Sequence, residues 1–149
     1  MNSVMGYIAK FIIIIGMMLL LLTFAIGCGQ DKNQEVTFQE LLTNPGEFEE
    51  KEITLVGFYF QGFEVQVIAE RLEYSGYAVG HMVPKGEMIW LEGGLPAEVY
   101  DRLYQQKIMT AEERYGKVRV TGTFECRGKY GHLGGYNPQI VPSKVILLE

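Results

Sequence analysis

The apolar run from Phe11 to Gly27 limits how the rest of the chain can fold. Its 17 residues carry no charge, and they fall short of the roughly 20 that a membrane-spanning helix needs. One basic residue, Lys10, precedes the run and small residues end it, which is the pattern of an export signal. The sequence therefore predicts that residues 1–27 form a hydrophobic signal helix and that the folded domain follows it.

The four residues from Ala25 to Cys28, AIGC, close this run. They resemble the lipobox of bacterial lipoproteins, although Ala25 stands where leucine is usual. The resemblance implies cleavage before Cys28, diacylglycerol on its sulfur and an amino group open to acylation, and two acyl chains hold a protein stably on a bilayer. We therefore expect a lipid anchor at Cys28 on the extracytoplasmic side of the cell membrane. An uncleaved signal anchor is the alternative, and it places the domain on the same side.

Cysteine usage and charge restrict the exported part further. Once Cys28 carries lipid, Cys126 has no partner for an intramolecular disulfide, so stability must come from a packed core. Loss of the signal removes Lys10 and no acid, which leaves 12 basic and 18 acidic residues and a formal net charge of −6. Nucleic-acid binding depends on clustered Lys and Arg, and these are scattered, so no nucleic-acid partner is expected. The polar residues 28–35 are interpreted as a flexible tether.

Residues 36–149 have the length of one domain, and most of their apolar pattern indicates strands. Thr37 and Glu40 form a capping-box pattern, which predicts a short helix that continues to Thr43. β-Branched and aromatic residues, in part alternating with polar ones, predict five strands, at residues 52–60, 64–69, 88–93, 117–125 and 138–148.

Two further helical segments are predicted between the third and fourth strands. Pro96 suits a first helical turn, and apolar residues recur at helical spacing through residues 96–106. Thr110 and Glu113 repeat the capping-box pattern and predict one more turn. Residues 73–87, with three glycines and a proline, are interpreted as a long loop.

The resulting order of elements is typical of the OB-fold, a five-stranded Greek-key barrel with a helix between strands 3 and 4. Gly57 suits a bend in the first strand, as such a barrel requires. Three segments, NPGEFEEKEITLVGFYF, GKVRVTGTFE and YGHLGGYNPQIVPSKVILLE, resemble bacterial lipoproteins with an OB-like domain of the tRNA-anticodon-binding type. The resemblance covers most of residues 36–149 and implies a mainly β barrel, but it implies no ligand or reaction.

The stretch KYGHLGGYNPQIV, residues 129–141, predicts a ligand-binding loop. OB-folds use the loop between strands 4 and 5 for binding, and glycines allow that loop to fold back. We therefore expect an aromatic platform that consists of Tyr59, Trp90, Tyr130, His132 and Tyr136. The alternative is that these rings only close one end of the barrel and that Trp90 belongs to the core.

These features favour a non-enzymatic binding or assembly module of the cell envelope, with a protein or glycan as its partner. Aromatic rings and hydroxyls suit sugars and peptides, whereas a charge of −6 disfavours phosphate backbones. Two alternatives stay open: a thiol-dependent enzyme that uses Cys126 with His132, and a single-stranded nucleic-acid binder by analogy of fold. His81 and His132 lack neighbours at metal-ligand spacing, so neither a metal nor another cofactor is expected.

Overall fold

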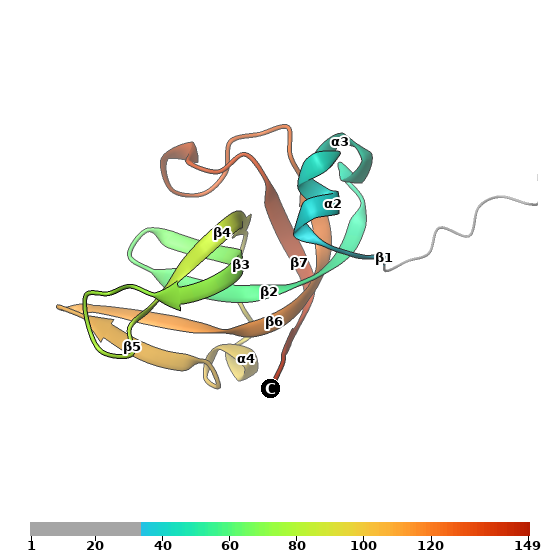
Figure 1. Cartoon of the computed structure of the whole chain (residues 1–149). Helices are drawn as coiled ribbons and strands as arrows, with labels where there is room; N and C mark the ends of the chain where they lie inside the picture. Colours follow the sequence, from blue (N-terminus) through green and yellow to red (C-terminus); the bar gives the residue numbers. More distant parts are fainter. Residues whose placement is uncertain (1–33) are drawn as a thin grey trace, which may run out of the picture. The chain divides into compact units, whose positions relative to one another are not determined.

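The computed structural model describes residues 34–149, so the predicted signal segment and the lipidation site at Cys28 lie outside the described residues (Figure 1). The described part is mainly β, as predicted. The tether predicted at residues 28–35 extends too far toward the C-terminus, because Gln34 and Glu35 already belong to a strand. That strand pairs in parallel with the strand that begins at Glu52.

Strands make up most of the described residues, and short helical turns separate some of them. In chain order, the elements are β1 (Gln34–Val36), α2 (Phe38–Thr43), α3 (Pro45–Phe48), β2 (Glu52–Gly62), β3 (Val65–Tyr74), β4 (Met82–Leu91), α4 (Ala97–Tyr100), β5 (Tyr104–Ile108), β6 (Ala111–Glu125), the 3-10 turn η1 (His132–Gly134) and β7 (Gln139–Leu147).

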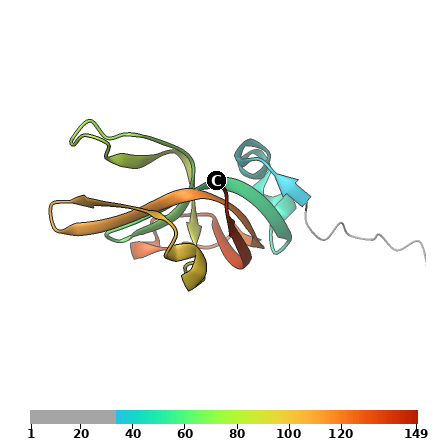
Figure 2. The same cartoon turned by 90° about the horizontal axis from the view of Figure 1, so that it is seen from below.

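The strand pairings form a closed circuit. β2 pairs antiparallel with β3 on one side and with β6 on the other, and β3 pairs antiparallel with β4. β4 pairs in parallel with β7, which returns antiparallel to β6. β1 adds to β2, and β5 adds to β6. Figures 1 and 2 show that β2 and β6 curve strongly, which lets each serve two neighbours.

The long loop predicted at residues 73–87 is wrong for most of its length. Only Ser75 to His81 connect the strands, because β3 continues to Tyr74 and β4 already begins at Met82. The extra residues pair across the hairpin, and Pro84 lies opposite Leu72. Backbone pairing with a neighbouring strand therefore outweighs the local turn preferences of glycine and proline.

The helical predictions for residues 96–106 and 110–113 are also largely wrong. α4 is a single turn that ends at Tyr100, and the following residues form β5 and the start of β6. These two strands make a hairpin that turns at Met109, whose φ is 54°. Tyr104 stacks on Tyr115 across this hairpin, with ring centroids 5.6 Å apart. Such cross-strand contacts decide between helix and strand where apolar spacing fits both.

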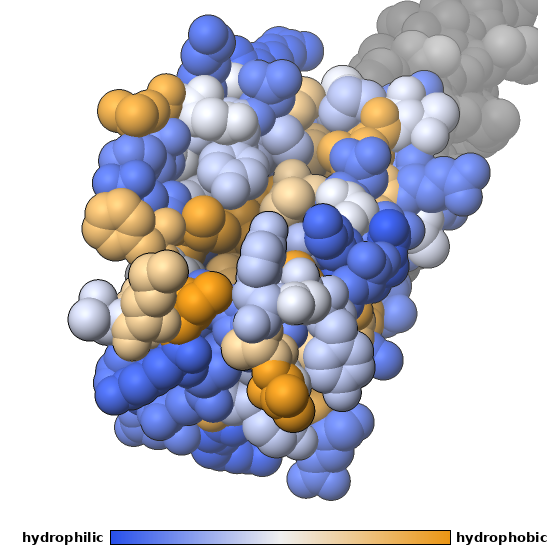
Figure 3. Space-filling view, turned by 60° about the vertical axis from the view of Figure 1, so that its left-hand side comes forward, coloured by the Kyte–Doolittle hydropathy of each residue, from blue (hydrophilic) through white to orange (hydrophobic). Residues whose placement is uncertain are grey.

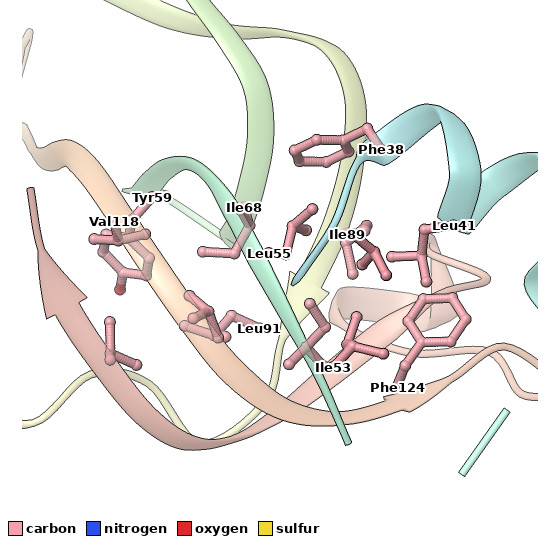
Figure 4. Close-up of a cluster of buried hydrophobic side chains, with 14 of the residues drawn as sticks. Phe38, Leu41, Ile53, Leu55, Tyr59, Ile68, Ile89, Leu91, Val118 and Phe124 are labelled. Carbon is pink, nitrogen blue, oxygen red and sulfur yellow. The ribbon is translucent and has the colours of Figure 1, made fainter. Parts of the chain in front are cut away.

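The short helix α2 forms as predicted and covers one end of the core. The Thr37 hydroxyl accepts a hydrogen bond from the Glu40 amide, and the Glu40 carboxylate accepts one from the Thr37 amide. The Thr37 hydroxyl also donates to this carboxylate at 2.8 Å, and the two bonds that the carboxylate accepts from Thr37 lower the pKa of Glu40. Phe38 and Leu41 of this helix are buried against side chains from the strands. Figure 4 shows Leu41 beside Ile89 and Phe124, at one end of a core that extends through Ile53, Leu55, Ile68 and Leu91 to Val118.

Candidate functional site

An aromatic cluster lies where the loop between β6 and β7 meets β4. The Trp90 and Tyr136 rings are tilted by 38° with their centroids 5.4 Å apart. The amide of Tyr130 donates to the carbonyl of Tyr136 at 2.7 Å, and the reverse bond is 3.1 Å long. These two bonds close the loop upon itself, so that Tyr136 is held against Trp90. We call Trp90, Tyr130, His132 and Tyr136, which the sequence predicted as binding residues, the loop cluster.

Gly131 explains why this loop needs glycine. Its φ is +69°, and a Cβ atom there would lie 2.6 Å from the Trp90 ring and 2.8 Å from the Tyr136 ring. The backbone therefore passes directly against the Trp90 ring, where no other residue fits. The Tyr130 ring instead packs against Gly128, where a Cβ would meet its hydroxyl at 2.7 Å. Burial is the main cause of the raised pKa values of Tyr130 and Tyr136.

Two carboxylates border the loop cluster. The indole N–H of Trp90 donates to Glu92 at 3.0 Å. His132 Nε2 lies 3.2 Å from a carboxylate oxygen of Glu64, which joins the loop to the turn between β2 and β3. Trp90 and Tyr136 are half-buried, and His132 is exposed. The surface therefore combines partly accessible aromatic rings with acceptors for hydroxyl or ammonium groups, which is chemistry suited to sugars and to peptides.

Tyr59 does not belong to the loop cluster, and its prediction as a ligand-binding residue is wrong. Its side chain is 1% exposed and lies in the core, as Figure 4 shows. The hydroxyl donates to Gln61 at 3.2 Å, and burial raises the pKa of the phenol. Apolar residues occupy both parities of β2, so the sequence could not show which of them face inward.

Cys126 and His132, the residues of the alternative thiol mechanism, have different partners. The amide of Cys126 donates to the Glu49 carboxylate at 2.7 Å, whereas His132 contacts Glu64. Desolvation and the neighbouring Glu49 carboxylate raise the pKa of the Cys126 thiol to about 11. A thiolate is the nucleophilic form of cysteine, so this surrounding keeps Cys126 in its unreactive form near neutral pH.

We expect Cys126 to react slowly with iodoacetamide at pH 7.5. A pKa about two units above the ordinary thiol value leaves about 100-fold less thiolate. The measurement is the alkylation rate of the Cys28→Ser protein compared with a small thiol such as N-acetylcysteine, followed by mass spectrometry from pH 7 to pH 10. A rate at pH 7.5 equal to or above that of the small thiol would show an activated cysteine and favour the enzymatic alternative.

A buried polar network, which the sequence did not indicate, joins the hairpin of β3 and β4 to the hairpin of β5 and β6. His81 is 4% exposed; its Nδ1 lies 2.8 Å from the Ser75 hydroxyl, and its Nε2 lies 2.8 Å from Glu113. Gln106 donates to Glu113 at 2.7 Å and to the carbonyl of Met82 at 2.6 Å. We call His81, Glu113 and Gln106 the latch, because they tie the loop after β3 to the hairpin of β5 and β6.

The chain Ser75–His81–Glu113 has the residue types of a hydrolase triad. However, the Ser75 hydroxyl also accepts a hydrogen bond from the amide of Tyr77 at 3.1 Å, as in a local turn. The imidazole is enclosed between the two hairpins. The geometry therefore supports a structural role for these residues. His81 and Glu113 are 32 positions apart, so the sequence shows the residue types but not the network.

Comparisons with protein families, with characterised proteins and with solved structures gave no match to this chain. Within residues 34–149, no helix has the length and apolar character needed to cross a bilayer. The same residues contain no group of three or more His, Cys, Asp or Glu side chains placed to hold a metal ion. A function for this chain must therefore be inferred from its own geometry.

Proposed function

We propose that this chain is a lipid-anchored module on the extracytoplasmic side of the cell membrane that binds an envelope glycan or protein and catalyses no reaction. The loop cluster is the observation that carries this proposal. The Trp90 and Tyr136 rings of this cluster are held against each other by the backbone hydrogen bonds of the loop and by the close approach of Gly131, so a partner would meet a preformed surface. Preformed surfaces lose less entropy on binding.

We further propose that the domain is an OB-like barrel of the type found in bacterial lipoproteins. The circuit of β2, β3, β4, β7 and β6 has the neighbours expected of a five-stranded Greek-key barrel, and α4 lies between its third and fourth strands. β1 and β5 are then additions to the basic five strands. Tyr130, His132 and Tyr136 of the loop cluster lie on the connection between strands 4 and 5, which OB-folds use for ligands, and Trp90 lies on strand 3.

The charges around the loop cluster favour a neutral or cationic partner. The Glu64 carboxylate lies 3.2 Å from His132, and the Glu92 carboxylate accepts the Trp90 indole hydrogen bond. Carboxylates at these positions accept hydrogen bonds from sugar hydroxyls or lysine side chains and repel phosphates. This argues against single-stranded nucleic acid. The raised pKa of Cys126 argues in the same way against a thiol enzyme.

Labelling with a clickable palmitate analogue in bacterial cells tests the anchor. We expect the wild-type protein to be labelled, the Cys28→Ser variant to lose the label, and the Cys126→Ser variant to keep it. The last variant is a matched control, since it removes the other cysteine of the chain. Equal labelling of the Cys28→Ser variant would refute lipidation at this position.

Trp90 is the single tryptophan of the chain, so its fluorescence reports directly on the loop cluster. We expect soluble peptidoglycan fragments to change this fluorescence in a saturable way. The Tyr136→Ala variant should weaken binding about two- to tenfold, because a contact with one aromatic ring contributes about 0.5–1.5 kcal/mol beyond its buried area. Tyr104→Ala, which removes a tyrosine from β5, is the control and should bind normally.

A protein partner is tested by photo-crosslinking in cells. Benzoylphenylalanine at Leu133, an exposed residue beside His132, should give a discrete adduct. The same probe at Gln39 on α2 should not, and Tyr136→Ala should abolish the adduct at Leu133. No response to peptidoglycan fragments together with identical adducts at both positions would overturn binding by the loop cluster.

A further inference from the structure

A cavity that shares no residue with the loop cluster lies between the hairpin of β3 and β4 and the hairpin of β5 and β6, and Leu147, Leu148 and Glu149 also line it. It has a volume of about 520 Å³, within the range of about 300–1,000 Å³ that small-molecule sites occupy. Phe58 of β2 contributes to its lining, together with Leu72 and Met82 from one hairpin and Tyr104 and Tyr115 from the other. We call this cavity the hairpin groove.

The latch holds the two walls of the hairpin groove in place. Met82 is a wall residue, and its amide and carbonyl are both bonded to Gln106 of β5, at 2.9 Å and 2.6 Å. Gln106 is bonded in turn to Glu113, which contacts His81. The separation of the hairpins is therefore fixed by a hydrogen-bonded network, so the groove is present before any ligand arrives.

The groove has a basic rim. Arg102 and Lys117 line it, and within residues 34–149 neither side chain has an ion pair or a hydrogen bond to another side chain. Glu149 supplies the one carboxylate side chain of the lining. Arg102 and Lys117 are thus two cations without an ion-pair partner in the described part of the chain, at one groove of a protein whose net charge is −5. The rim is therefore suited to an anionic group.

Apolar residues are also exposed at the tips of the two hairpins that bound the groove. Tyr77 and Val79, in the loop after β3, and Met109, at the turn of β5 and β6, are almost fully exposed. Figures 1 and 2 agree that these two turns lie at the same end of the domain. Figure 3, which brings this side forward, shows hydrophobic surface with hydrophilic surface around it.

We propose that the hairpin groove binds a single acyl chain that ends in an anionic head group. The apolar and aromatic walls receive the hydrocarbon, and Arg102 and Lys117 bind the carboxylate or phosphate. An acyl chain leaves no polar group unsatisfied among these walls, whereas a peptide would bring amide and carbonyl groups that need partners. A free fatty acid and a lysophospholipid share this chemistry.

The test uses the full-length protein in isolated membrane vesicles and a 16-carbon fatty acid that carries a diazirine and a terminal alkyne. After irradiation, we expect mass spectrometry to locate adducts on peptides from β3, β4, β5 and the start of β6. An excess of palmitate should abolish them, and hexadecanol, which lacks the charge, should compete weakly. Competition by lysophosphatidylglycerol better than by palmitate would identify a lipid head group as the anionic end.

Charge-reversed variants give the decisive comparison. Arg102→Glu and Lys117→Glu each alter an exposed side chain and should leave the fold intact. We expect each to reduce adducts in the groove about tenfold, the effect of losing one charge-assisted contact. Lys51→Glu, the same change before β2, is the control. Adducts spread evenly over the surface, or unchanged in both variants, would overturn the proposal for the groove without bearing on the loop cluster, whose tests use different probes.

Discussion

Replacement of Phe124 by alanine is expected to lower the free energy of unfolding by about 4 kcal/mol. Phe124 is fully buried, and Figure 4 shows its ring beside Leu41 of α2. The ring therefore fills the space between β6 and the helix that covers this end of the core. Its removal leaves a cavity that the surrounding backbone cannot close, because β6 pairs with both β2 and β7.

The measurement is urea unfolding of the exported domain, followed by the fluorescence of Trp90. Leu133→Ala is the matched control, since its side chain is 92% exposed and its loss should change stability by less than about 0.5 kcal/mol. A decrease of less than about 1 kcal/mol for Phe124→Ala would mean that α2 does not pack closely on this ring.

Local sequence patterns were sufficient where the deciding contacts are local. Residues 117–125 alternate between apolar and polar and were predicted as a strand, and Val118, Val120 and Phe124, which share one face of it, are fully buried. The capping box predicted the start of α2, and both of its hydrogen bonds are present. In each case the residues that determine the structure lie within a few positions of one another.

Prediction failed where pairing between distant segments decides the structure. Tyr104 fits helical spacing as well as a strand, and its stack on Tyr115 exists only once β5 and β6 pair. His81 and Glu113 are 32 positions apart, so their contact depends on two hairpins coming together. The orientation of Tyr59 likewise depends on the pairing of β2 with β3 and β6.

The sequence indicated where the candidate site lies, but only some of the residues that form it. The glycines at residues 129–141 indicated a loop that approaches aromatic rings, and Gly131 does lie against Trp90. The carboxylates of Glu64 and Glu92 come from other parts of the chain, so the charge of the loop cluster could not be anticipated. No local sequence pattern predicts the hairpin groove, because strands that are distant in the sequence supply its walls.

Gly57 explains how β2 can pair with two neighbours. β2 pairs with β6 from Glu52 onward, but its pairing with β3 begins only at Phe58. A Cβ atom at Gly57 would lie 2.6 Å from Cγ2 of Ile68, 2.9 Å from the carbonyl oxygen of Ala69 and 3.1 Å from the Phe38 ring. The two strands thus approach too closely at this point for any side chain.

We expect Gly57→Ala to lower the free energy of unfolding by about 3 kcal/mol, since extra atoms in a packed core force backbone shifts. In a domain of this size, that loss lowers the melting temperature by about 10 °C. Gly46→Ala in α3 is the control, because a Cβ there meets nothing within 4 Å. It should leave the melting temperature unchanged or raise it slightly.

A double variant separates the effect of the Ile68 methyl group on a side chain at position 57 from that of the Ala69 carbonyl oxygen. Ile68→Ala removes the Cγ2 methyl but not the Ala69 carbonyl oxygen, so Gly57→Ala should cost less in the Ile68→Ala background than in the wild type, without becoming neutral. Strict additivity of the two losses would show that Ile68 does not obstruct Gly57. A neutral Gly57→Ala single variant would show that β2 does not need its close approach to β3 there.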